Sequence, residues 1–179
     1  MHTLHKKGFT LIETLVAVTI LMIAIAGPLT VAMKAYTASL DARNQTIATS
    51  LAQETMEYLN YVKDNGPKNN NSGFQGFIQG NDCNSSGNTC DILFNQSDGS
   101  LSYGSCSGGA CVLRNSAALG YNHGAVDASN KITPFTRYFY LGNVPASAKQ
   151  TLATVVVSWN TGSTHSDVTL QEVLANVPR

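Results

Sequence analysis

Near the N-terminus stands the segment Lys6-Lys7-Gly8-Phe9-Thr10-Leu11-Ile12-Glu13, and no charged residue follows it from Thr14 to Met33. An apolar run of roughly twenty residues is long enough to cross a bilayer as a helix. The two lysines before the run predict an N-terminus in the cytoplasm and a translocated remainder. Glu13 lies just inside the apolar run, where an ionisable group is costly and indicates a function. We therefore expect a partner charge for this carboxylate.

The same segment resembles the processing site of type IV pilins and of the related pseudopilins of type II secretion systems. The resemblance covers the basic leader, the glycine before the cut, the aromatic residue after it and the glutamate at position five of the mature chain. It implies that a prepilin peptidase cleaves between Gly8 and Phe9 and that the amino group of Phe9 is N-methylated. It also implies that Glu13 serves assembly, by pairing with the mature amino terminus of its own or a neighbouring chain. Thr10, Leu11 and Ile12 are interpreted as helix-packing residues.

Two other kinds of N-terminal segment fit parts of this pattern. A secretory signal peptide places its small-residue cleavage site after the apolar region, whereas Gly8 precedes that region. An ordinary signal anchor is the second alternative, and an intact Lys7–Phe9 segment in cells would support it.

The helix is predicted to continue beyond the apolar run. Apolar residues recur at helical intervals after Met33, which predicts an amphipathic helix over residues 34–64. The sequence Asn65-Gly66-Pro67 then favours a helix end. A helix from about Phe9 to about Asp64 would measure about 80 Å. Its first half would form a membrane or filament core, and its second half would pack on a globular domain.

Gly27 and Pro28 predict a break in this helix, because proline removes a backbone donor and clashes with the preceding turn. A tolerated kink, common in membrane helices, is one interpretation. The other is a segment that unwinds when the subunit passes from bilayer to filament. The resemblance to pilins supports this second interpretation.

Residues 65–111 are rich in Asn, Ser and Gly, which predicts a variable loop region within a globular domain of residues 65–179. Four cysteines lie in this region, and an even number in a translocated domain predicts two disulfides. Three connectivities are possible, and the near-neighbour pairing would staple two loops. A zinc site is the alternative, although the spacings lack tight Cys-x-x-Cys arms. The cysteines are Cys83, Cys90, Cys106 and Cys111.

Residues 112–179 are predicted to be mainly β-sheet. The segments 135–141 and 151–159 are rich in β-branched and aromatic residues, and residues 160–163 form a turn before a partner strand at 167–174. In that last strand Val168, Leu170 and Val173 are expected to face the helix. The fold class is therefore α+β, with a pilin-like long N-terminal helix packed on a C-terminal antiparallel sheet.

No enzymatic motif is present, and no cofactor is predicted. His165 and Asp167 share a turn, where solvated side chains are expected. Asn95, Asp98 and Asp127 could supply oxygen ligands to calcium, but no EF-hand loop accompanies them, and no metal is predicted. The formal net charge is zero and no run of Lys or Arg indicates a nucleic-acid surface.

The sequence therefore predicts a structural subunit of a type IV pilus or a type II secretion pseudopilus. The resemblance implies other pilin subunits, a prepilin peptidase and an inner-membrane assembly platform as partners. It implies a single-pass inner-membrane protein with its C-terminal domain outside the cytoplasm, later incorporated in a filament. The passage 43–57 resembles minor subunits that initiate or cap filaments. A major pilin and a tip-displayed binding module, such as an adhesin or DNA-uptake subunit, are the alternatives.

Overall fold

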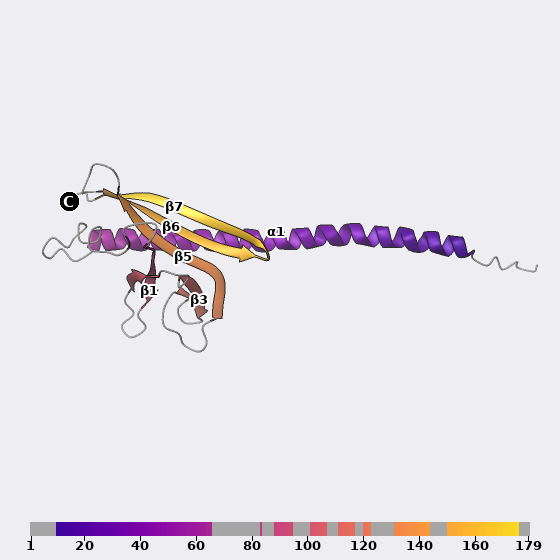
Figure 1. The fold of residues 1–179 in the computed structure, drawn as a ribbon, viewed down its shortest axis with the longest axis horizontal. Helices are drawn as coiled ribbons and strands as arrows, with labels where there is room; N and C mark the ends of the chain where they lie inside the picture. Colours follow the sequence, from indigo (N-terminus) through magenta and orange to yellow (C-terminus); the bar gives the residue numbers. More distant parts are fainter. Residues whose placement is uncertain are drawn as a thin grey trace, which may run out of the picture. The chain divides into compact units, whose positions relative to one another are not determined.

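The computed structural model describes residues 10–65, 83, 88–94, 101–106, 111–116, 120–122, 131–143 and 150–175 (Figure 1). Its single described helix, α1, spans Leu11–Asn65. The chain divides into two compact units, Met1–Ala42 and Arg43–Arg179, so the division lies within α1. The helix was predicted to run from about Phe9 to about Asp64, and Phe9 lies outside the described residues.

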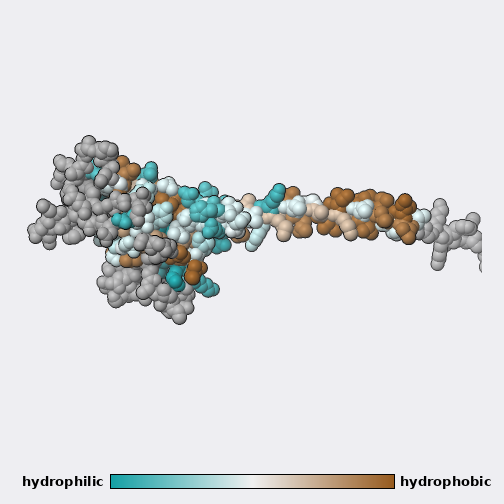
Figure 2. Space-filling view, viewed as in Figure 1, coloured by the Kyte–Doolittle hydropathy of each residue, from teal (hydrophilic) through white to brown (hydrophobic). Residues whose placement is uncertain are grey.

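The first unit contains the N-terminal part of α1, which is long and apolar enough to cross a membrane. Its side chains are exposed on every side from Thr10 to Ser39, and Figure 2 shows apolar residues gathered along it. A helix that is apolar all round is stable only in an apolar environment. Three hydroxyls of the apolar run are satisfied within the helix, because Thr14, Thr19 and Thr30 donate to carbonyls three residues earlier, each at 2.8 Å. This part of α1 therefore has the properties that a bilayer demands.

The second unit packs the C-terminal part of α1 against an antiparallel sheet, of which the described residues form seven strands (Figure 1). Strand β5 lies at the centre, pairing with β6 along one edge and with β3 and β1 along the other. Strand β7 pairs with β6, β2 with β1, and β4 with β3. The strands are β1 (Cys90–Phe94), β2 (Leu101–Ser105), β3 (Val112–Ser116), β4 (Gly120–Asn122), β5 (Lys131–Asn143), β6 (Gln150–Thr161) and β7 (Thr164–Ala175).

The core lies between α1 and the inner face of β5, β6 and β7. Alternate residues of β6 are buried, as expected for a strand with one face on a helix, and Ala153, Val155 and Val157 are fully buried. They face a helix stripe that includes Leu51, Met56 and Leu59. These contacts confirm the predicted α+β, pilin-like arrangement.

One detail of the predicted sheet is wrong. Val173 is 52% exposed and pairs with Leu152 on the face away from the helix, whereas Val168 and Leu170 pack against the core as predicted. A strand alternates its side chains with period two, so Val173 cannot share a face with Val168 and Leu170.

The predicted loop region also contains the hairpin of β1 and β2. The turn-forming residues around β2 gave no sequence signal for this strand. A Cβ at Gly104 would lie 2.8 Å from Leu93 Cδ1, so a larger residue there would require the Leu93 side chain to move.

The folded domain should lose stability in alkali because of Tyr58. Burial, together with the nearby phenols of Tyr103 and Tyr61, raises the pKa of Tyr58 from 10.0 to about 12. Between these values the unfolded chain ionises Tyr58 while the folded chain keeps it protonated, so the free energy of unfolding falls as pH rises. Tyr58→Phe should flatten this fall, whereas Tyr36→Phe, at an exposed position, should not. Urea unfolding at several alkaline pH values checks this, and identical slopes for the two variants would contradict it.

Candidate functional site

The start of α1 is fixed by Thr10. The backbone N–H of Glu13 donates to the Thr10 carbonyl at 3.1 Å and lies 3.4 Å from the Thr10 hydroxyl oxygen, which also accepts. The N–H of Thr14 donates to the same carbonyl at 3.3 Å. Thr10 is therefore the helix N-cap, a role that the sequence analysis did not assign, and its part in helix packing stays a prediction. The Thr-x-x-Glu spacing of a capping box was the signal for this role.

Glu13 lies in the first turn of α1, directly after this cap, and is exposed. A carboxylate near a helix N-terminus interacts favourably with the helix dipole. In hydrocarbon the helix dipole offsets only a small part of the free-energy cost of a charged carboxylate, so a cationic partner is still expected. Gly8 and Phe9, the predicted cleavage and methylation positions, lie outside the described residues.

Helix α1 continues through Gly27 and Pro28 in this structure, so the predicted break is not present here. The Thr30 hydroxyl donates to the carbonyl of Gly27 at 2.8 Å, next to the position where proline supplies no N–H. Unwinding of this segment during assembly stays a prediction.

Two disulfides join near neighbours in the sequence, Cys83 to Cys90 and Cys106 to Cys111. The prediction of disulfides is thus confirmed, and the zinc alternative fails because all four sulfurs are bonded in pairs. In the described parts of the chain, no three His, Cys, Asp or Glu residues are grouped as metal ligands. The suggested calcium ligands Asn95, Asp98 and Asp127 lie outside the described residues.

The disulfide-bonded segments are tied to the central strand by backbone hydrogen bonds. The N–H of Leu141 donates to the carbonyl of Cys83 at 2.8 Å, and the N–H of Arg137 donates to the carbonyl of Cys111 at 3.0 Å. The N–H of Cys106 donates to the Thr89 carbonyl at 3.0 Å. The first two of these hydrogen bonds hold Cys83 and Cys111, one cysteine of each disulfide, against β5.

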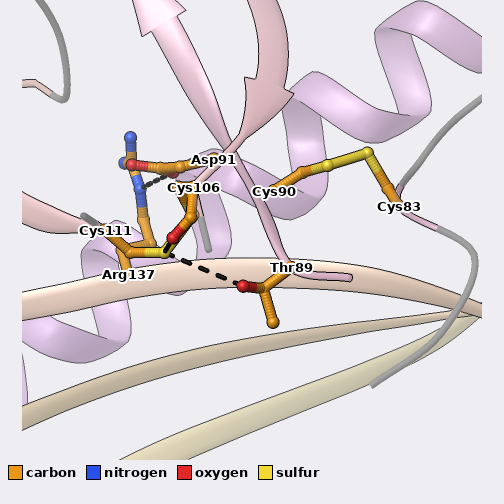
Figure 3. The surroundings of a disulfide bond; sticks show 7 residues. All are labelled: Cys83, Thr89, Cys90, Asp91, Cys106, Cys111 and Arg137. Carbon is orange, nitrogen blue, oxygen red and sulfur yellow. Dashed lines mark hydrogen bonds and ion pairs between the residues drawn. A yellow bond between two sulfur atoms is a disulfide. The ribbon is translucent and has the colours of Figure 1, made fainter. Parts of the chain in front are cut away.

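A buried ion pair lies beside these disulfides (Figure 3). The Arg137 guanidinium on β5 donates to the Asp91 carboxylate on β1 at 2.8 Å, and both side chains are almost fully buried. A second guanidinium nitrogen reaches the more exposed carboxylate of Glu54 on α1 at 3.5 Å. Arg137 thus connects the central strand to the disulfide-stapled hairpin and to the helix.

The prediction from sequence missed this cluster, although a signal was present. In the run 135–141, the two-residue period of a strand puts Arg137 on the same face as Phe135 and Phe139, which are core residues. A charged side chain on an inward face needs a buried partner. The partner itself could not be found, because Asp91 lies in a region of turn-forming composition.

His165 and Asp167 lie near the start of β7 rather than on the predicted turn. His165 is exposed and its Nδ1 lies 3.0 Å from Asn160 Oδ1, while Asp167 accepts from the Thr169 hydroxyl at 3.4 Å. These contacts are local to the hairpin of β6 and β7, and they fit the expectation of solvated side chains.

Residues 4–27 match the family model of the prokaryotic N-terminal methylation motif. The match includes the predicted cleavage junction, Glu13 and most of the apolar run. Comparison with curated proteins and with solved structures gives no significant match.

Proposed function

We propose that this chain, which its N-terminal methylation motif marks as a type IV pilin or pseudopilin, is a minor subunit of a pilus or secretion pseudopilus. Proteins of this class are structural subunits that associate with the membrane and with other pilins. The finer proposal is that the chain helps to initiate or cap the filament. It rests on the resemblance of residues 43–57 to minor subunits.

One observation carries the role in polymerisation. The apolar part of α1 is exposed on every side, yet its threonine hydroxyls at positions 14, 19 and 30 donate within the helix. Such a helix can be stable first in lipid and then against the helices of other subunits, since neither environment supplies hydrogen bonds. We propose that Glu13, at the start of this helix, fixes the register between neighbouring subunits. Its carboxylate would pair with the amino terminus of Phe9 in its own or a neighbouring chain.

The two disulfides support a globular domain outside the cytoplasm, because disulfides persist in oxidising compartments. We propose a route in which the chain is inserted in the inner membrane and is cut after Gly8 by a prepilin peptidase. Methylation of Phe9 and incorporation through an inner-membrane assembly platform follow.

Processing can be tested by intact mass and N-terminal sequencing of the protein from its native membrane. Cells with prepilin peptidase should yield a chain that begins at N-methylated Phe9, and cells without it should retain Met1–Gly8. Gly8→Val should also block cleavage, because a branched side chain fills the space that glycine leaves for the peptidase. Lys34→Gln is the matched control and should be cleaved normally. If the chain keeps Met1–Gly8 in cells that contain the prepilin peptidase, the protein is a simple membrane-anchored domain instead.

The minor role can be tested by counting copies. Quantitative mass spectrometry of purified filaments should find this subunit far below the most abundant pilin. A chain that forms the bulk of the filament would be a major pilin instead.

A further inference from the structure

The hairpin of β1 and β2 makes few non-covalent contacts with the rest of the sheet. Within the described residues, β1 pairs with β5 only at Cys90 and Phe139, whereas β6 pairs with β5 over nine consecutive residues. The buried side chains described in this hairpin lie at positions 90–92, and none of the five residues of β2 is buried. Tyr103 on β2 makes an edge contact with Phe139, with ring centroids 6.3 Å apart. A segment with so short a backbone ladder opens at a lower free energy than the core of its domain.

Both disulfides lie at one end of this hairpin (Figure 3). Cys90 begins β1 and pairs with Ser105 at the end of β2, and Cys106 follows directly. Their bonded partners, Cys83 and Cys111, are the residues whose carbonyls accept from backbone N–H groups of β5. Each disulfide thus connects one strand of the hairpin to a segment that is hydrogen-bonded to the central strand.

The buried ion pair of Arg137 and Asp91 also joins the hairpin to β5, but it is a weak attachment. Opening the hairpin would return both charges to water, and their recovered hydration offsets most of the attraction that is lost. A covalent bond has no such compensation. The two disulfides are therefore the contacts that keep the base of the hairpin beside β5.

We propose that the hairpin of β1 and β2 is a separately opening unit, which its two disulfides hold closed. In the reduced chain the hairpin opens from β5 and exposes Asp91 to water, while α1 and strands β5, β6 and β7 stay folded. All four cysteines are buried in the closed form, the most exposed of them, Cys111, by 4%. Oxidation therefore takes place in the open form, and closing then shields the disulfides from reductants.

Closing requires an oxidant that exchanges disulfides with the chain. For each bond, one cysteine thiolate attacks the disulfide of the oxidant, and the second cysteine displaces the oxidant from the mixed disulfide. The oxidant leaves as a dithiol that carries the two electrons and the two protons of the cysteine pair. Because thiols stay reduced in the cytoplasm, the hairpin closes only after the domain has been translocated. This step is independent of the filament that the subunit joins.

Hydrogen exchange followed by mass spectrometry tests this inference on the detergent-solubilised full chain. One sample is unfolded in urea and refolded with dithiothreitol. Its matched control is the same chain unfolded and refolded without reductant, which keeps both disulfides. Reduction should speed exchange of the β1 and β2 amides by about tenfold or more, whereas exchange at residues 153–157 of β6 should change by less than about twofold.

A variant with one disulfide removed makes the test independent of the fully reduced chain. Cys106→Ser with Cys111→Ser keeps the bond between Cys83 and Cys90 and should give a smaller rise in exchange of the hairpin amides. Shielding is measured by treatment with dithiothreitol and then maleimide. The folded oxidised chain should gain no maleimide in the time that the urea-unfolded chain gains four.

Three results would overturn the inference. If exchange in β6 rises together with exchange in β1 and β2, the domain opens as one unit. If exchange in the hairpin does not change on reduction, the disulfides do not hold it closed. If the folded oxidised chain gains maleimide as fast as the unfolded chain, closing does not shield the disulfides.

Discussion

Arg137→Ala is expected to lower the free energy of unfolding by about 3–5 kcal/mol, because it leaves the buried carboxylate of Asp91 without its guanidinium. The loss of packing by the arginine stem adds to the effect, since Arg137 is among the largest fully buried side chains. Urea unfolding of the detergent-solubilised full chain, followed by the fluorescence of the single tryptophan, Trp159, measures the change. Trp159 lies in the core beside Phe135, so its emission reports on this part of the domain.

A second variant separates charge from packing. Arg137→Met combined with Asp91→Leu removes both charges and keeps apolar volume, so it should be closer in stability to the parent chain than Arg137→Ala is. Lys131→Ala, at an exposed position of the same strand, should change stability by less than about 0.5 kcal/mol. A loss below about 1 kcal/mol for Arg137→Ala would mean that water reaches Asp91 and that the pair is not buried in solution.

The long helix and the last three strands could be predicted from sequence because each has a strong local signal. The uncharged run after Glu13 requires a helix in any apolar environment, and Val155–Val157 is a run that only a buried strand accommodates well. The hairpin of β6 and β7 followed from its turn residues, and the positive φ of Gly162 (62°) shows why glycine is present there.

Other features could not be predicted because they depend on contacts between distant residues. Strand β2 is five residues long and contains Gly104, so its local preference for a strand is weak, and it forms through its pairing with β1. The buried ion pair of Arg137 and Asp91 connects residues that are 46 positions apart in the sequence. Glu57 on the helix and Glu172 on β7 line one groove, which only the folded domain brings together. Local patterns identify elements, whereas polar sites between elements require the tertiary structure.

The role of Thr10 lies between these cases. The Thr-x-x-Glu spacing of Thr10 and Glu13 is a capping signal that can be read in the sequence. The resemblance to a processing site implies a role for the glutamate but none for the threonine as a cap. Glu13 therefore has two roles that can be separated by mutation. Its backbone N–H donates to the capping residue Thr10, and its side-chain carboxylate can pair with a cation.

Glu13→Gln is expected to abolish incorporation into filaments while leaving membrane insertion intact. The amide keeps the size of the side chain but cannot pair with a cationic amino terminus, and an uncharged side chain enters lipid more readily than a carboxylate. Because 1.4 kcal/mol corresponds to a tenfold change in an equilibrium, losing one such pair per subunit should lower incorporation by more than about tenfold. Immunoblots of sheared filaments and of membranes measure the two quantities.

Thr10→Ala is the matched control for the helix start. It removes the capping hydroxyl, at a cost of about 1 kcal/mol to the helix, but leaves the carboxylate of Glu13 in place. Incorporation of this variant should stay within a few-fold of the parent chain, whereas Glu13→Gln should remain in the membrane. If Glu13→Gln enters filaments normally, the carboxylate serves only the helix dipole. If Thr10→Ala fails as severely as Glu13→Gln, the order of the first helical turn, rather than the charge, controls assembly.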